Sequence, residues 1–164
     1  MQKLKAFLIS ALILFGLWLL LGGLSRDEVL VGAIVAVLVS LIFLPRMTLL
    51  SDIRFSPKSL LFMPIYLLVF LIELIKSTID VARRVVSPSL PINPGIVKVK
   101  TRLKSPLGRI VLANSITLTP GTMTVETDGE DFYIHWIDIR TDDIDGATKA
   151  IVSKFERYLE VIFG

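Results

Sequence analysis

A cluster of ionisable side chains in an otherwise apolar helical stretch offers the chemistry that stands out in this sequence. Glu73, Lys76 and Asp80 follow one another at spacings of three and four residues, which places them on one face of a helix. Because ionisable residues at membrane depth are costly and normally face protein or water, the three are candidates for an ion path or for charges between helices. The alternative is the end of an interfacial helix that leaves the membrane and docks on a neighbour, since the charges cluster at one end.

The rest of the composition argues against catalysis and metal binding. The chain has no Cys, which excludes disulfides, thiolate catalysis and Cys-ligated metals. Its one histidine, His135, cannot build a multi-histidine site; it could be a lone proton carrier or a residue tolerated in a strand. Asp142, Asp143 and Asp145 lack the spacing of a calcium loop and suit the start of a helix. With no phosphate-binding loop and no nucleophile beside a base, we predict a non-catalytic protein without a cofactor or metal.

Three hydrophobic stretches dominate the first half of the chain. Hydrophobic residues make up 53% of the sequence and the mean hydropathy is +0.72, well above a usual soluble domain. We predict membrane helices within residues 1–86, at about 6–22, 28–44 and 57–84. The short loop after the first helix makes the first two an antiparallel hairpin. Since the region has no repeated halves and no set of central ionisable residues, we do not expect the chain to transport ions alone.

A small α+β domain is predicted over residues 96–164, after a proline-rich linker at 87–95. The expected order is β-α-β-β-α, with strands at 96–103, 122–127 and 130–139. Ser105-Pro106 suits the start of the first helix, and one further helix is expected from Thr141 onward. A domain of about 70 residues has a thin core, so we expect it to lean on partner subunits.

The last two strands are predicted to form a hairpin closed by a two-residue turn at Asp128-Gly129. This register would place Val125 opposite Phe132, and Met123 opposite Ile134. Those pairs would line one apolar face, while polar side chains would occupy the other.

Charge is distributed unevenly between the two parts. Residues 1–94 carry nine Lys and Arg against five Asp and Glu, a net +4, and residues 95–164 carry nine against ten, a net −1. The stretch between Asp80 and Glu126 is basic without an acidic residue, which fits an anionic cytoplasmic membrane surface. Nucleic acid is discounted as a partner because a membrane anchor explains the charge. Two crossings plus an interfacial helix would place nearly all basic residues inside, but we expect three crossings and a cytoplasmic domain.

The segment from Asn114 to Thr122 is predicted to join a helix, a tight turn and a strand. Pro120 restricts Thr119 to extended geometry, so the helix should end just before it. Pro120-Gly121 suits the centre of a type II turn, because Gly accepts the positive φ required there. Polar residues here could simply satisfy backbone groups near the helix end.

This nine-residue run, Asn-Ser-Ile-Thr-Leu-Thr-Pro-Gly-Thr, with Tyr-Ile-His-Trp at residues 133–136, resembles the E subunit of the Mrp-type multisubunit Na+/H+ antiporters. The resemblance covers essentially the whole chain. Similar subunits occur in membrane-bound hydrogenases and sulfur-reducing complexes that carry an Mrp-like module. The resemblance marks as motif or interaction candidates Asn114, Ser115, Thr117, Thr119, Pro120, Gly121, Thr122, His135 and Trp136.

The resemblance implies an accessory subunit of a plasma-membrane Na+/H+ antiporter, or the equivalent subunit of an ion-pumping redox complex. Its partners would be the other membrane subunits and the lipid bilayer, and the assembly would perform the ion exchange. Two other classes of function stay open: a small transporter formed by oligomerisation, and a membrane-anchored binding module.

Overall fold

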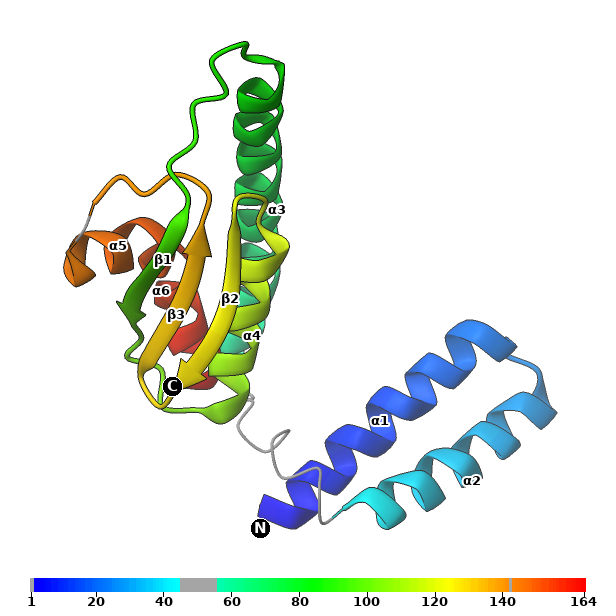
Figure 1. Cartoon of the computed structure of the whole chain (residues 1–164). Coiled ribbons are helices and arrows are strands. Elements are labelled where there is room, and N and C mark those ends of the chain that lie inside the picture. The colour runs from blue at the N-terminus through cyan, green and yellow to red at the C-terminus, as the bar shows by residue number, and fades with distance from the viewer. Residues whose placement is uncertain (1, 45–55, 142) are drawn as a thin grey trace. The chain divides into compact units, whose positions relative to one another are not determined.

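The computed structural model describes residues 2–44, 56–141 and 143–164, and it divides the chain into two compact units, residues 1–53 and 54–164. Figure 1 shows a helical hairpin as the first unit, and a long helix with a small sheet and further helices as the second. The predicted helical N-terminal region followed by a small α+β domain is thereby confirmed. By length and composition, two of the described helices could cross a membrane, the first and the third.

The first unit consists of α1 (Gln2–Gly22) and α2 (Arg26–Phe43) packed against each other. Ser25 caps α2 by accepting a hydrogen bond from the Glu28 N–H. The Trp18 Nε1–H donates to Glu28 Oε2 over 2.9 Å and ties the two helices together near the loop. Gly32, Ala36 and Ser40 are the buried residues of α2. Their small side chains let the two backbones approach closely.

Gly32 provides a test of this packing. A Cβ at Gly32 would collide with the indole of Trp18, whereas a Cβ at Gly16 would meet no atom within 4 Å. Gly32→Ala should therefore destabilise the hairpin by about 1–3 kcal/mol through overpacking, measured as a lower melting temperature of the full chain in detergent. Gly16→Ala is the matched control, because it should not lower the melting temperature. Equal effects of the two changes would contradict the packing described.

The second unit begins with α3 (Pro57–Val86), which Ser56 caps by accepting the Ser59 N–H over 3.0 Å. Around it the structure arranges β1 (Gly95–Lys100), α4 (Pro106–Leu118), β2 (Thr122–Asp128), β3 (Asp131–Trp136), α5 (Ile144–Ile151) and α6 (Ser153–Phe163). The strands form one antiparallel sheet in the order β1-β3-β2. Helices α4 and α6 cover one face of the sheet, and α3 runs alongside them (Figure 1).

The core of the second unit lies between the sheet and its helices. Its fully buried side chains include Leu112, Phe132, Ile134, Phe155 and Leu159. Tyr66 and Phe70 of α3 pack against this core. By these contacts α3 is part of the same compact unit as the α+β domain. The hydrophobic pattern of the sequence groups α3 with the membrane helices, whereas its contacts are with the α+β domain.

The hairpin turn is Gly129-Glu130 and not the predicted Asp128-Gly129, and the predicted register of the β2–β3 hairpin is wrong by two residues beside the turn and by one residue beyond a bulge. Thr127 pairs with Phe132 and Thr124 with Ile134, with a bulge at Val125 between them. Met123 and Val125 are consequently about half exposed. The core side of β2 instead carries hydroxyls, since Thr124 Oγ1 donates to the Ala113 carbonyl of α4 over 3.0 Å. Beyond the bulge the offset is one residue, which reverses the face of each β2 side chain there, and the hydrogen bonds of β2 to α4 hold this register.

The predicted single C-terminal helix is also wrong, because the chain forms two helices that meet at Val152. The N-terminal half, α5, lies against β1, where the Thr148 hydroxyl accepts the Lys100 N–H over 3.0 Å. The second half, α6, packs on α3 and α4. Because α5 and α6 pack on different elements, their helix axes point in different directions. One straight helix could not make both sets of contacts. At the start of α5, the Thr141 hydroxyl and the Gly146 N–H hold the pKa of the Asp143 carboxyl below its usual value.

A buried carboxylate, Glu156 of α6, fixes the chain segment after β1. Its Oε1 accepts the Thr101 hydroxyl over 2.6 Å and the Arg102 N–H over 2.7 Å. Its Oε2 accepts Arg102 Nε over 3.2 Å. The three hydrogen bonds to this buried carboxylate join α6 to the segment just after β1, which lies far from α6 in the sequence.

Replacing Glu156 should therefore cost stability. Glu156→Gln keeps the shape but removes one acceptor from a buried set of donors, and should lower the free energy of unfolding by about 2 kcal/mol. Thermal unfolding of the full chain in detergent, followed by circular dichroism, measures the change. Glu160→Gln, on the same helix and facing the more exposed side of Arg102, should change stability by less than about 1 kcal/mol. A loss as large at Glu160 would argue against the buried role.

Candidate functional site

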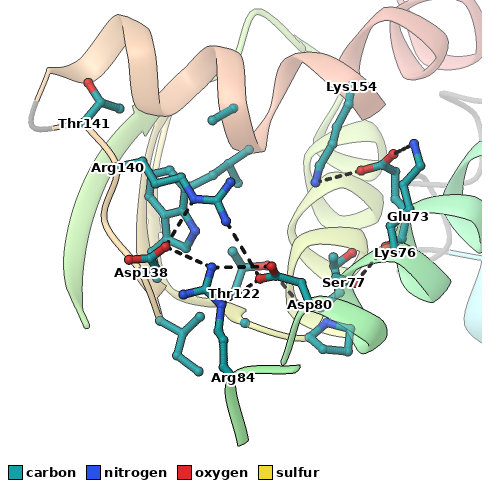
Figure 2. Close-up of a pocket in the computed structure, with 17 residues that line it drawn as sticks. Glu73, Lys76, Ser77, Asp80, Arg84, Thr122, Asp138, Arg140, Thr141 and Lys154 are labelled. Atoms are coloured by element: carbon teal, nitrogen blue, oxygen red, sulfur yellow. Dashed lines mark hydrogen bonds and ion pairs between the residues drawn. The ribbon is translucent and has the colours of Figure 1, made fainter. Parts of the chain in front are cut away.

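A polar cleft of about 340 Å³ lies where the second half of α3 meets the turn before β2 and the segment after β3. Figure 2 shows charged side chains from α3, from the β3–α5 connection and from α6 pointing into this space. The walls combine the ionisable residues of α3 with part of the motif segment. The residues that line the cleft include Glu73, Lys76, Asp80, Arg84, Thr119, Pro120, Gly121, Thr122, Trp136, Asp138, Arg140 and Lys154.

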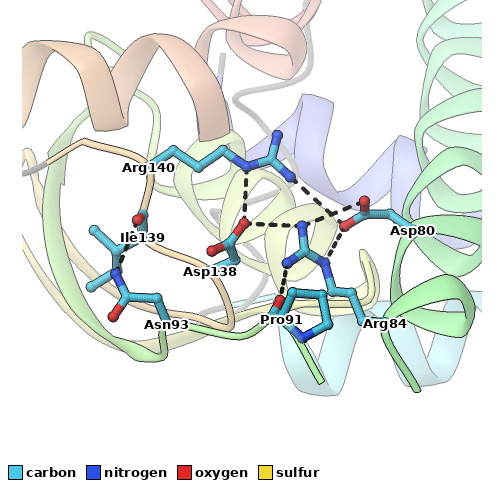
Figure 3. A network of polar contacts seen from close by, with 7 residues as sticks. All are labelled: Asp80, Arg84, Pro91, Asn93, Asp138, Ile139 and Arg140. Carbon is cyan, nitrogen blue, oxygen red and sulfur yellow. Dashed lines mark hydrogen bonds and ion pairs between the residues drawn. The ribbon is translucent and has the colours of Figure 1, made fainter. Parts of the chain in front are cut away.

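Four of these side chains form a closed ring of alternating charge (Figure 3). Arg84 lies 2.8 Å from Asp80 and 3.0 Å from Asp138. Arg140 lies 3.2 Å from Asp138 and 3.8 Å from Asp80. The Arg84 guanidinium also donates to the Pro91 carbonyl over 2.6 Å. A planar guanidinium suits such a role because it donates in several directions at once, and the ring fastens the end of α3 to the end of β3.

A second set of ion pairs closes the other side of the cleft. Glu73 of α3 accepts from Lys76 over 3.0 Å and pairs with Lys154 of α6 over 3.2 Å. Within the cleft, each of the carboxylates of Glu73, Asp80 and Asp138 is therefore paired with two cations. The charge of such a carboxylate is already compensated by its partners. This arrangement favours a structural role, in which ion pairs hold the elements together, over a site that takes up and releases cations.

The turn at residues 119–122 is held by its own hydroxyls. Thr119 Oγ1 donates to the Ser115 carbonyl over 2.7 Å, and Thr122 Oγ1 donates to the Ile116 carbonyl over 2.8 Å. Gly121 has φ +90°, a region that favours glycine. A Cβ on Gly121 would come within 3.0 Å of Ile137 and 3.5 Å of Val81, so glycine also allows α3 to pass close to the turn.

The structure brings most, but not all, of the predicted site residues together. Glu73, Lys76 and Asp80 share the cleft with the turn residues and Trp136. Ser115 lies apart, buried, donating to the Val111 carbonyl and hydrogen-bonded to the Tyr66 hydroxyl. Asn114 and Thr117 are exposed on α4, and Thr117 Oγ1 accepts the Thr124 N–H.

His135 lies on the opposite face of the sheet from the core. Its strand alternates with buried Phe132, Ile134 and Trp136, and its neighbours across the sheet are Ile96 and Met123. His135 thus lies outside the set of residues that line the polar cleft.

Among the residues of the cleft that sequence reasoning missed are the charged partners of α3, namely Asp138, Arg140 and Lys154. Each joins α3 only through contacts between segments distant in the sequence, so spacing along the chain carries no signal for them. Among the residues that the structure describes, no group of three His, Cys, Asp or Glu side chains could hold a metal ion. The arrangement supports fastening of elements and charge compensation.

A family model described as Na+/H+ ion antiporter subunit matches residues 11–162. The chain belongs to this family. The E1 subunit of the Na+/H+ antiporter of Staphylococcus saprophyticus is 40% identical over 97 residues, which are 58% of this chain and 59% of that protein. The E subunit of the Na+/H+ antiporter of Alkalihalophilus pseudofirmus is 46% identical over 72 residues, which are 43% of this chain and 46% of that protein. The chain spans about half the length of the curated relatives it matches, and the resemblance to the E subunit of these antiporters is confirmed.

Solved structures of this family's relatives match as well. A chain in the membrane-bound sulfane sulfur reductase, an archaeal respiratory membrane complex, is 40% identical with a TM-score of 0.85, covering 97% of this chain and 99% of that chain. A chain in the Mrp complex from Dietzia sp. DQ12-45-1b is 29% identical with a TM-score of 0.43, covering 61% of this chain and 94% of that chain.

Arg84 is the residue through which the ring can be tested. Arg84→Gln leaves Asp80 and Asp138 without their shared guanidinium and removes the bond to Pro91. It should lower the free energy of unfolding by about 2 kcal/mol and speed amide hydrogen exchange in the last turns of α3. Arg83→Gln is the matched control, because Arg83 is exposed and its loss should change stability by less than about 0.5 kcal/mol. Equal effects of the two substitutions would contradict the role of the ring.

Proposed function

We propose that the chain is an accessory subunit of a multisubunit Na+/H+ antiporter. The observation that carries this proposal is the family match over residues 11–162, with relatives named as the E or E1 subunit of such antiporters. The equivalent subunit of an ion-pumping respiratory complex is the second candidate, favoured by the match along nearly the whole chain to the sulfane sulfur reductase. In both cases the partners are other membrane subunits, and ion movement is a property of the assembly.

We propose that the subunit has a structural role and is not itself catalytic. The paired charges of the cleft support this, because Glu73, Asp80 and Asp138 are balanced by Lys and Arg. A fixed ion pair keeps two elements together, whereas a conducting site must bind an ion and let it leave. The alternative, a place for Glu73, Lys76 and Asp80 on an ion path, makes a different prediction for their substitution.

We further propose a plasma-membrane location with the α1–α2 hairpin crossing the bilayer and the α+β domain in the cytoplasm. If α1 and the antiparallel α2 both cross, Lys3 and Lys5 share a side with the basic residues that follow α2. The short loop between the helices, with Arg26, Asp27 and Glu28 just after it, lies on the other side and has a net charge of −1. This distribution fits the tendency of basic residues to remain inside.

The identity of the assembly is tested by gentle extraction of the native membrane and purification of the chain with its neighbours. We expect large antiporter-like membrane subunits to travel with it. The same subunits together with metal-cluster redox proteins would select the respiratory complex. Recovery of the intact chain alone would contradict both forms of the proposal, and ion flux by that isolated chain in liposomes would favour a self-sufficient transporter.

The structural role is tested by Asp80→Ala and Glu73→Ala, measured for both assembly and exchange. We expect less assembled complex in native gels, because each change leaves cations in the cleft unpaired, and normal Na+/H+ exchange for each complex that does assemble. Lys149→Ala, on the exposed side of α5, is the control for a general effect of surface charge. Normal assembly with lost exchange would overturn the structural role and favour the ion path.

A further inference from the structure

The long helix α3 is covered on one face along nearly its entire length. Near its start, the Ser59 hydroxyl donates to the Val161 carbonyl over 3.0 Å. In its middle, the rings of Phe70 and Phe155 lie 6.4 Å apart, and near its end Arg84 reaches Asp138. From residue 59 to residue 84 the helix is about 38 Å long at about 1.5 Å per residue. The covered length exceeds the hydrocarbon core of a bilayer, about 30 Å.

The elements that cover α3 are polar on their outer side. Helix α6 carries the exposed Arg157 and the partly exposed Glu160, and Arg140 of the ring is also exposed. If α3 crossed the bilayer with this packing intact, these charged groups would enter the hydrocarbon, which is costly. The packing of α3 on the domain and a membrane crossing by α3 are therefore mutually exclusive.

The other face of α3 is apolar and exposed. Leu68 and Ile75, near its centre line, are both 59% exposed. Within α3, which the structure describes from end to end, the charged residues lie on the packed side or along one flank, where Lys58, Lys76 and Arg83 are exposed. The exposed apolar residues that form the strip are Leu60, Leu61, Leu68, Leu71, Ile75 and Ile79. A strip of this length on a protein surface marks a site of contact with a partner or a membrane.

A shallow groove continues the apolar strip toward α4. It has a volume of about 220 Å³ and is lined mainly by Tyr66, Phe70, Val111 and Leu118. Leu118 is 62% exposed. The apolar surface is therefore wider than one helix face.

We infer that α3 lies in the plane of the membrane, on its cytoplasmic surface, with its apolar strip in the anionic lipid interface. This replaces the expected third crossing, and it rests on the proposed function only in that the chain is held in a membrane. Besides Lys76, which pairs with Glu73, the flank carries the exposed Lys58 and Arg83, and such side chains reach lipid phosphates while their stems lie on the apolar boundary.

The sidedness of the two ends of α3 separates this arrangement from a crossing. The chain has no Cys, so Lys58→Cys and Ser89→Cys each report one site in the full chain. An impermeant maleimide should label both variants in inverted vesicles and neither in right-side-out vesicles. Labelling of the two sites from opposite sides would overturn the inference.

The depth of the apolar strip separates lipid from a protein partner. An environment-sensitive fluorophore is attached to the full chain at Leu68→Cys or at Ile75→Cys. The labelled chain, with the subunits that accompany it, is placed in liposomes of phosphatidylcholine and phosphatidylglycerol. A nitroxide near the headgroup should quench both labels to a similar extent, and more strongly than a nitroxide deep in the acyl chain. A label at Lys149→Cys, on α5, is the unquenched control. Lack of quenching at both strip positions would overturn the inference in favour of a protein partner.

The role of anionic lipid is tested with the double variant Lys58→Gln, Arg83→Gln. In this variant the label at Ile75→Cys should be quenched less by the headgroup nitroxide, and removal of phosphatidylglycerol should have the same effect. Lys149→Gln should leave the quenching of that label unchanged. Unchanged quenching in all three cases would overturn the anionic part of the inference. Purification of the chain with its neighbours tests the subunit role separately, so each proposal can fail without the other.

Discussion

The packing of α3 against the α+β domain is the constraint on which the second unit depends. The sheet has three strands, and its helices alone leave part of the core uncovered. Tyr66 and Phe70 of α3 pack against that core, while the ion-pair ring of Asp80, Arg84, Asp138 and Arg140 fastens the far end of the helix. Apolar contact supplies most of the stabilisation, and the ring fixes position, since exposed and half-exposed ion pairs contribute modestly by themselves.

The same constraint explains the residues of the motif segment, 114–122. Thr119 and Thr122 close the turn with their hydroxyls, and Gly121 lets α3 pass close by. These residues are bonded within the protein itself, and their geometry determines where α3 lies. The segment thus serves the architecture of the chain.

A helix that satisfies the length and composition of a membrane span need not cross a membrane. Length and composition measure only whether a helix could be surrounded by lipid, and α3 meets both criteria. Its residues Glu73, Asp80 and Arg84, however, pair with a polar domain that covers one side of α3 along nearly its entire length. Burying the charged groups of the domain in hydrocarbon would cost more free energy than keeping one apolar face of α3 at the membrane interface. The interfacial position is therefore favoured.

The elements that depend on local pattern can be predicted from the residues alone. The apolar stretches predicted the three long helices, Ser56 and Ser105 cap their helices as expected, and the turn with glycine at residue 121 lies where Pro120-Gly121 placed it. The run from Asn114 to Thr122 was specific enough to predict the family. These features follow from backbone geometry and periodicity, which neighbouring residues fix.

Tertiary structure decided what depends on contacts between distant segments. The β2–β3 register follows from the hydrogen bonds of β2 to α4, and the break at Val152 follows from the different packing partners of α5 and α6. The sequence placed Glu73, Lys76 and Asp80 on one helix face but could not supply Asp138, Arg140 and Lys154 as their partners. No spacing rule relates residues that meet only when the chain folds, and for that reason the cleft, and the covered face of α3, became visible only in three dimensions.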